Sequence, residues 1–237
     1  MSSAGTTKEW PILEWWQVAE RLAQQTFQVQ RAQSCGTAFL CGQGIEPEAK
    51  FRHYIFATAW HVVSDLLEDD EFSLFRRIDG TAITGATDNI AIARLGPEAF
   101  DLGLLFIRTA SDVLPRERMM PVRGLKSFPS LGDDLGWYGH PASLDHDPTF
   151  CRGSLACYKT DPVANCYLVS GATYPGVSGA GVADQRGWII GVVSKWWTDP
   201  NLPNGQGMVQ VAPSTMIRHV LEDRLGAKVL DVLPEGT

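Results

Sequence analysis

The sequence predicts an all-β fold with helices only near its two ends. From residue 25 onward, short apolar or alternating segments are bounded by glycine, proline, aspartate and asparagine, a pattern typical of strands joined by turns. Many short strands with few long helices form barrels or sandwiches. The candidate strands span residues 37–41, 53–58, 72–78, 90–95, 102–107, 135–138, 154–158, 166–169, 188–194 and 208–211.

Two amphipathic helices are predicted outside the strand region. Residues 11–24 place apolar side chains at helical spacing, so this segment is expected to pack on the body of the fold. Its tryptophans Trp10, Trp15 and Trp16 lie close together, which leaves open a second interpretation as a docking surface for a regulatory protein. A second helix is predicted over residues 213–225, with Ser214 as its cap.

The composition indicates an ordinary soluble globular protein. The chain has 237 residues, of which 44% are hydrophobic and 20% charged, enough for one sizeable domain or two small ones. The net charge of −7 argues against a general nucleic-acid binder and against binding to anionic membranes, since both favour a basic face. No apolar run is long enough to span a bilayer.

The N-terminus and the cysteines together favour a cytoplasmic protein. No basic segment followed by an apolar segment opens the chain, so no signal peptide is predicted. The five cysteines are an odd number, which favours free thiols in a reducing compartment. Neither the cysteines nor the scattered histidines follow a zinc-binding spacing, so no metal or other cofactor is expected.

One serine lies in a glycine-rich segment that is suited to a nucleophile. The segment Thr173-Tyr-Pro-Gly-Val-Ser-Gly-Ala-Gly-Val contains Ser178, and a nucleophilic serine needs an exposed Oγ with backbone N–H groups nearby to bind an oxyanion. Gly176 allows the backbone to turn so that the N–H groups of Gly176 and Ser178 point the same way. Taken alone, the same segment is also compatible with an ordinary turn.

A histidine and an aspartate precede this serine at the ends of apolar segments. His61 closes the run that begins at Tyr54, and Asp101 opens the apolar run 102–107. A half-buried carboxylate at that position needs a donor, and a histidine Nδ1–H would serve. Individually, His61 could be a core histidine and Asp101 a strand-entry residue. Their occurrence in the order His, Asp, Ser within one β-rich chain favours a joint catalytic role.

Seven segments in the same order resemble the chymotrypsin-like serine peptidases, particularly the bacterial branch that includes the HtrA/Deg proteases. The resemblance covers roughly residues 30 to 225. The segments are Gly36-Thr-Ala-Phe-Leu, Thr58-Ala-Trp-His-Val, Asp101-Leu-Gly-Leu-Leu, Gly139-His-Pro, Pro175-Gly-Val-Ser-Gly, Gly187-Trp-Ile-Ile-Gly-Val-Val-Ser and Val211-Ala-Pro-Ser-Thr.

The resemblance implies two six-stranded antiparallel Greek-key barrels with the active site between them. By similarity, His61, Asp101 and Ser178 would be the triad of a serine endopeptidase, with an acyl-enzyme intermediate. Gly176 and Ser178 would supply the oxyanion-hole N–H groups. The expected organisation is an N-terminal helical segment 1–24, a first barrel 25–115, a linker 116–130, a second barrel 131–212, and a C-terminal helix with a tail 213–237.

The resemblance also points to a substrate pocket for a protein or peptide. By similarity, Ala172 would lie at the pocket base, with Thr173, Ser194, Lys195 and Trp196 nearby. The base is not acidic, so a small or medium uncharged residue is expected before the scissile bond. Lys195, if exposed, could instead favour an acidic group on the substrate.

Two departures from the family bear on regulation. Val177 stands where the digestive enzymes carry an aspartate that grips a new N-terminus, so activation by N-terminal cleavage is not expected. Little chain follows residue 225, so no PDZ domain is expected either. Regulation by a partner or ligand is the hypothesis that remains.

Two other functions are compatible with parts of the sequence. An α/β-hydrolase esterase could use Ser178, Asp199 and His219 in that order, but Ala180 breaks the Gly-x-Ser-x-Gly motif. A catalytically silent fold of the same family could serve as a protein-binding module, and the intact set of catalytic residue types argues against this alternative.

Overall fold

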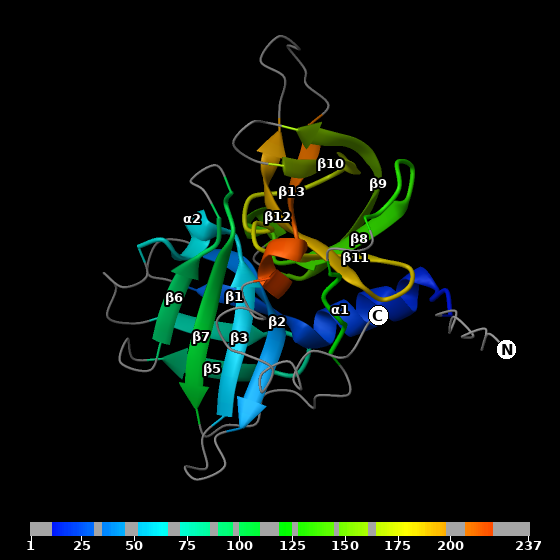
Figure 1. Cartoon of the computed structure of the whole chain (residues 1–237). Coiled ribbons are helices and arrows are strands. Elements are labelled where there is room, and N and C mark those ends of the chain that lie inside the picture. The colour runs from blue at the N-terminus through cyan, green and yellow to red at the C-terminus, as the bar shows by residue number, and fades with distance from the viewer. Residues whose placement is uncertain are drawn as a thin grey trace, which may run out of the picture.

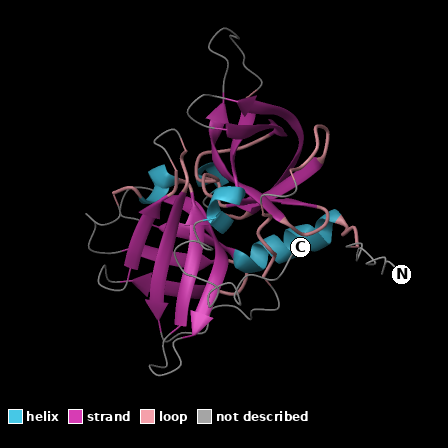
Figure 2. Ribbon diagram, viewed as in Figure 1, coloured by secondary structure: helices cyan, strands magenta, loops and turns pink. Residues whose placement is uncertain are grey.

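The computed structural model contains two β-rich units that lie side by side (Figure 1). It describes residues 11–30, 35–45, 52–65, 72–85, 90–96, 100–109, 119–124, 128–144, 147–160, 165–197 and 207–219. Strands dominate both units, and the helices lie at their margins (Figure 2). The predicted all-β class with two barrel-like halves is therefore confirmed.

The first unit is a seven-stranded antiparallel sheet that the described strands leave open. Its strand order is β5-β4-β1-β2-β3-β7-β6, so it has one strand more than the six expected. A short helix, α2 (Trp60–Val63), follows β3 directly. The strands are β1 (Thr26–Gln30), β2 (Cys35–Ile45), β3 (Arg52–Thr58), β4 (Phe72–Arg76), β5 (Thr81–Gly85), β6 (Ile90–Arg94) and β7 (Gly103–Thr109).

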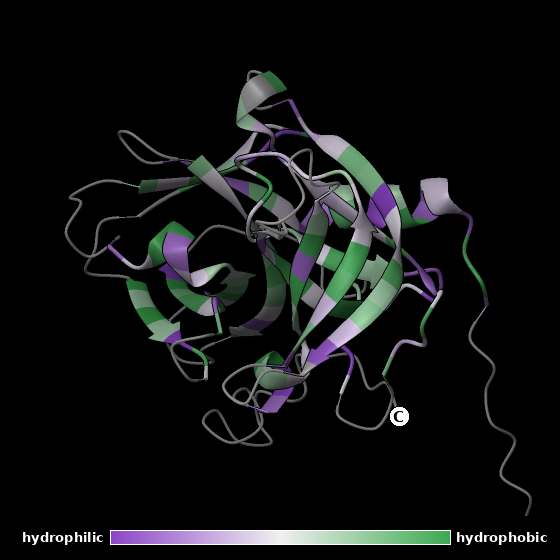
Figure 3. Cartoon of the chain, turned by 90° about the horizontal axis from the view of Figure 1, so that it is seen from above, coloured by the Kyte–Doolittle hydropathy of each residue, from purple (hydrophilic) through white to green (hydrophobic). Residues whose placement is uncertain are grey.

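The second unit closes into a barrel of the predicted six strands. Its order is β10-β13-β12-β11-β8-β9, and its core is built around Trp137, Leu155 and Val211. Hydrophobic and hydrophilic residues alternate along many of the strands, as the banding in Figure 3 shows. The strands are β8 (Asp134–Gly139), β9 (Thr149–Thr160), β10 (Asn165–Gly171), β11 (Gly181–Asp184), β12 (Ile189–Trp197) and β13 (Met208–Pro213).

Helix α1 (Trp15–Gln25) corresponds to the helix predicted over residues 11–24, which was expected to pack on the body of the fold, and it contacts strands of both units. Its buried side chains Val18 and Leu22 belong to one apolar cluster that also contains Phe39 of β2 and Ile189 of β12. The helix begins where Glu14 N–H donates to Gln17 Oε1 over 2.9 Å. The apolar stripe of this helix therefore serves as part of the core between the two sheets.

The sequence also predicted a C-terminal helix and free cysteines. Residues 215–219 are helical, whereas Pro213 is the last residue of β13 and Ser214 lies in a turn, so the helix begins two residues later than predicted. Residues 220–225 of the predicted helix lie outside the described residues. All five cysteines are free thiols, as predicted. Among the helices in the described ranges, none is long and apolar enough to cross a membrane.

A buried arginine joins the end of α1 to the first sheet. The Arg76 guanidinium is 6% exposed and donates to the carbonyl of Gln24 over 2.8 Å, to Thr81 Oγ1, and to both carboxylate oxygens of Asp79. It also lies over the ring of Phe27. The side-chain hydrogen bond from Arg76 lowers the pKa of Asp79 to about 2, although burial acts in the opposite direction.

Replacing Arg76 with methionine is expected to lower the free energy of unfolding by about 2 kcal/mol, because the Gln24 carbonyl loses its donor. The depressed pKa of Asp79 stabilises the fold only above the unfolded-state value near 4, and this contribution disappears as the pH falls towards 2. The deficit of Arg76→Met should therefore shrink between pH 5 and pH 3 in urea titrations. Arg77→Met, at an exposed neighbouring position, is the matched control and should change stability little.

Candidate active site

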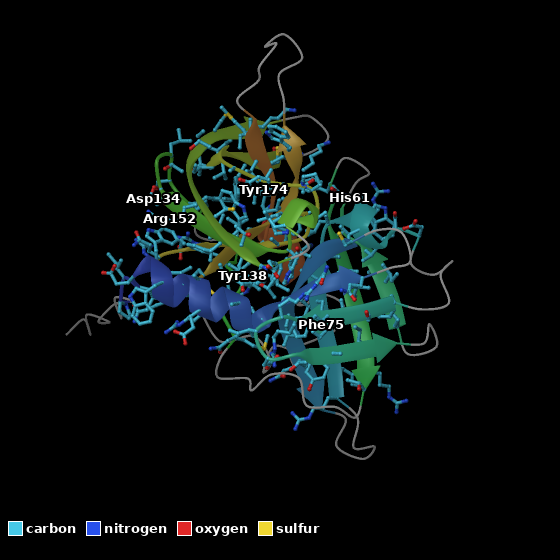
Figure 4. The ribbon with its side chains drawn as sticks, turned by 180° about the vertical axis from the view of Figure 1, so that it is seen from behind. His61, Phe75, Asp134, Tyr138, Arg152 and Tyr174 are labelled. Atoms are coloured by element: carbon cyan, nitrogen blue, oxygen red, sulfur yellow. The ribbon has the colours of Figure 1, made fainter. Side chains whose placement is uncertain are left out.

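His61 and Asp101 lie at the same end of two adjacent strands. Thr58, the last residue of β3, pairs with Gly103, the first residue of β7. His61 follows β3 on α2, and Asp101 precedes β7 by two residues. Antiparallel pairing therefore brings two residues that are distant in sequence into contact. Figure 4 shows His61 at the upper end of the first sheet, on the side of the second barrel. Tyr174 lies on that barrel.

The Asp101 carboxylate binds both the ring and the backbone of His61. Oδ2 lies 2.6 Å from His61 Nδ1, and Oδ1 accepts from His61 N–H over 2.9 Å. An ionised carboxylate can only accept, so the ring proton must sit on Nδ1. This tautomer leaves Nε2 with a free lone pair, which is what a general base requires.

Ser194 of β12 provides a third hydrogen bond to the same carboxylate. Its Oγ donates to Asp101 Oδ2 over 2.9 Å, and the serine is 1% exposed. Burial by itself raises the pKa of Asp101, but the hydrogen bonds from His61 and Ser194 outweigh it, so this pKa lies below its ordinary value. Asp101 therefore stays ionised through the mildly acidic range.

Ser178 follows a tight turn between β10 and β11. Val177 N–H donates to the carbonyl of Tyr174 over 3.1 Å, and Gly176 between them has a φ of 95°. Because Pro175 fixes a negative φ at the preceding position, this is a type II turn, in which the third residue needs a positive φ. Glycine at 176 is thus required by the backbone conformation.

The two peptide groups that carry the predicted oxyanion donors are fixed by their carbonyl ends. The Pro175 carbonyl accepts from Ala142 N–H over 2.8 Å, and the Val177 carbonyl accepts from Ala180 N–H over 3.0 Å. In a trans peptide the N–H points opposite to the C=O. The N–H groups of Gly176 and Ser178 therefore point away from these partners, and within the described residues neither donates a hydrogen bond.

The Ser178 side chain is partly exposed. Within the described part of the chain, no hydrogen bond joins Ser178 Oγ to the His61 ring. Catalytic hydrogen bonds are often long in the absence of substrate. The His61 side chain is 52% exposed, so a substrate can reach the ring.

A pocket of about 490 Å³ lies next to this turn on the second barrel. Ala172, Thr173 and Trp196, three of the residues expected to bind substrate, line it together with Tyr174 and Met208. None of its described lining residues carries a charge. Ser194 and Lys195, which were expected in the same pocket, are not among those residues. Ser194 faces Asp101 instead, and Lys195 is exposed.

Comparison with protein families places these features in a known class. A family model described as a trypsin-like peptidase domain matches residues 36–192, a range that includes His61, Asp101 and Ser178. The chain belongs to the trypsin-like peptidase family. This chain is a serine peptidase, an enzyme that hydrolyses peptide bonds. A comparison with curated protein sequences finds no match.

Solved structures of several proteases share the fold at low sequence identity. The inactive form of the Rv3671c protease of M. tuberculosis matches with a TM-score of 0.59 and 16% identity, covering 90% of this chain and 92% of that one. The serine endoprotease from Yersinia pestis matches with a TM-score of 0.62 and 18% identity, over 90% and 67% of the two chains. The HtrA-type protease AlgW with a tripeptide gives 0.63 and 18%, over 90% and 65%.

Several contacts of this site were not predicted from the sequence. Three such contacts connect different strands or loops. Ser194 bonds to Asp101, and Ala142 N–H bonds to the Pro175 carbonyl. Thr37 bonds to the carbonyls of Gly176 and Ser178 in the segment 174–178, which we call the serine turn. Thr37 and Ser194 do lie in segments that resemble the family, Gly36-Thr-Ala-Phe-Leu and the run that ends at Ser194. No group of three or more metal-ligating side chains occurs in the described ranges.

Proposed function

We propose that this trypsin-like peptidase is a serine endopeptidase that uses His61, Asp101 and Ser178 as a triad and forms an acyl-enzyme. The observation that carries the proposal is the pair of bonds from His61 to Asp101, because they set the tautomer that leaves Nε2 able to accept a proton. It is supported by the position of Ser178 directly after a type II turn, and by the N–H groups of Gly176 and Ser178, neither of which donates a hydrogen bond within the described residues.

The proposed reaction proceeds in two halves. Ser178 Oγ attacks the scissile carbonyl carbon while His61 Nε2 takes the hydroxyl proton, and the carbonyl oxygen becomes an oxyanion bound by the N–H groups of Gly176 and Ser178. The C–N bond then breaks as His61 returns the proton to the leaving amine. Water attacks the remaining ester with the same base and releases the acid. Asp101 stabilises the imidazolium in both halves.

The pocket supports an uncharged residue on the amino side of the scissile bond. Its described lining is free of charge, and Ala172 provides a small apolar wall, so burying a lysine or arginine there would leave a cation without a partner. Exposed Lys195 lies outside the described lining. A neutral side chain of small or medium size is therefore the proposed preference, within a protein or peptide substrate.

Regulation by a partner is part of the proposal. Val177 is buried in the core of the second barrel, so the serine turn is supported by apolar packing where a digestive enzyme would use a salt bridge to a new N-terminus. On α1, Trp15 packs on Phe150 and Arg152. Trp10, the third tryptophan of the predicted docking surface, lies outside the described residues. Trp16 is 67% exposed and the nearby Ile12 is 75% exposed, and these two side chains are the described part of the proposed docking surface for a regulatory protein.

Labelling with a fluorophosphonate probe tests the proposal without a known substrate. The wild-type chain is expected to gain one adduct, detected as a mass shift and mapped to the peptide that contains Ser178. Ser178→Ala is expected to gain none, and Ser194→Ala should still be labelled at Ser178, because its hydroxyl serves Asp101 and not the probe.

The outcomes separate the peptidase from the binding-module alternative. An adduct on Ser178 that disappears in Ser178→Ala supports a formed nucleophile and its oxyanion donors. A folded wild-type chain that stays unlabelled, both alone and with cell lysate added, contradicts the proposal and favours a catalytically silent binding module of the same fold.

A further inference from the structure

Thr37 of β2 lies between the two sheets and bonds to the serine turn through both its backbone and its side chain. The residue is fully buried. Its backbone N–H donates to the Ser178 carbonyl over 2.9 Å, and its Oγ1 donates to the Gly176 carbonyl over 2.8 Å. Thr37 therefore holds two carbonyls of the turn that carries the proposed nucleophile.

The same hydroxyl also accepts a hydrogen bond from the neighbouring loop. His140 N–H donates to Thr37 Oγ1 over 3.2 Å. Two residues later in this loop, Ala142 N–H donates to the Pro175 carbonyl, which is the bond that orients Gly176 N–H. The Thr37 hydroxyl therefore bonds both to the loop that contains Ala142 and to the turn that contains Pro175.

The loop and the turn pack closely at Gly176. A Cβ built on Gly176 would overlap the His140 carbonyl and lie 2.9 Å from Ala142 N. Rotating the Pro175–Gly176 peptide by half a turn would convert the type II turn to type I and point Gly176 N–H the other way. The bond from Ala142 opposes this rotation only while the loop stays in register with the turn.

Behind Thr37, a second threonine connects the turn to the histidine. Thr58 Oγ1 donates to the Thr37 carbonyl over 2.7 Å, and Thr58 lies three residues before His61 at the end of β3. A hydrogen-bonded path therefore runs from the end of β3, three residues before the proposed base, through Thr37 to the turn that precedes the proposed nucleophile. Thr37 is the residue at which this path branches to the loop.

We infer that Thr37 is a positioning residue whose hydroxyl keeps Gly176 N–H oriented as an oxyanion donor. This inference rests on the proposed function. Valine at 37 has nearly the same shape but neither donates to Gly176 nor accepts from His140, so the loop and the turn lose their common partner. Serine keeps both bonds and loses only a methyl group.

The test measures the second-order rate constant of fluorophosphonate labelling at a temperature at which thermal melting shows every variant to be folded. Thr37→Val is expected to be labelled about 10- to 100-fold more slowly, somewhat less than the loss of a whole oxyanion donor. Thr37→Ser should stay within about threefold of wild type. The deficit of Thr37→Val should be the same at every pH from 6 to 9, because it arises from N–H orientation and not from the base.

Thr26→Val is the matched control for lost stability. Thr26 is equally buried, and its Oγ1 donates to the Leu22 carbonyl over 2.7 Å at the end of α1, away from the serine turn. The melting temperature of Thr26→Val should fall by about as much as that of Thr37→Val. The labelling rate of Thr26→Val should stay at the wild-type value.

The outcomes distinguish this inference from the proposed function. If wild type is labelled on Ser178 and Thr37→Val reacts equally fast, the role of Thr37 is overturned and the peptidase proposal stands. Equal losses in Thr37→Ser and Thr37→Val would also overturn it, because the methyl group and not the hydroxyl would then matter. An unlabelled wild type overturns both.

Discussion

Replacing Asp101 with asparagine is expected to slow fluorophosphonate labelling of Ser178 by on the order of 10³- to 10⁴-fold. All three groups bonded to the carboxylate are donors in the native arrangement: the His61 N–H, the His61 Nδ1–H and the Ser194 hydroxyl. An asparagine amide offers only one acceptor atom, so one of these positions must face an NH₂ group. The backbone N–H of His61 cannot change its role.

The amide nitrogen is therefore expected to take the Oδ2 position and donate to Nδ1 of His61. That bond moves the ring proton to Nε2, and a protonated Nε2 cannot accept the proton of Ser178. The variant should remain folded, because asparagine has nearly the same shape as aspartate. Thermal melting provides the control for folding, and Asp79→Asn, at the distant Arg76 pair, provides the control for a lost carboxylate. A labelling rate for Asp101→Asn within tenfold of wild type would contradict the role assigned to Asp101.

Replacing Gly179 with alanine is expected to lower the free energy of unfolding by about 4 kcal/mol. Gly179 has a φ of 94°, a conformation that is strained for any residue with a Cβ. A Cβ at this position would also overlap the Thr37 carbonyl and Thr58 Oγ1. Strain and overlap therefore add at a residue that directly follows the proposed nucleophile, so labelling should be strongly reduced as well.

Gly132→Ala separates these two contributions. Gly132 has a similar φ of 88°, and a Cβ there would meet nothing within 4 Å. Gly132→Ala should lower the free energy of unfolding only by the backbone strain, on the order of 1 kcal/mol. The rate of labelling at Ser178 should not change. Urea titrations of both variants measure the difference. Equal destabilisation at the two positions would mean that the packing of Gly179 against Thr37 contributes nothing.

The strands that could be predicted from the sequence are those with long apolar or alternating patterns. Residues 53–58 and 102–107 are clear examples, and the structure pairs them as β3 and β7. Three strands were not predicted. β5 and β11 are short, with small side chains such as Ala82 and Ala183 that give a weak pattern. β1 follows α1 at Thr26 without an intervening turn residue, so no boundary signal separates the two elements.

The site shows a similar division between local and long-range information. The residue types around His61, Asp101 and Ser178 form local motifs that the sequence displays directly. The hydrogen bond of Ser194 to Asp101 joins residues 93 positions apart and that of Thr37 to Gly176 joins residues 139 apart. Such bonds depend on how the two sheets pack against one another, and no local pattern encodes that packing.

The closure of the second barrel has a consequence for the time at which the site forms during synthesis. Strand β13 pairs with both β10 and β12, so the barrel cannot close until residues 208–213 have left the ribosome. Ser194, which bonds to Asp101, lies on one of the two strands that β13 joins. A nascent chain that already displays His61 and Ser178 therefore still lacks a closed barrel around them. Hydrolytic capacity should therefore appear only after residues 208–213 have been synthesised and have paired with β10 and β12.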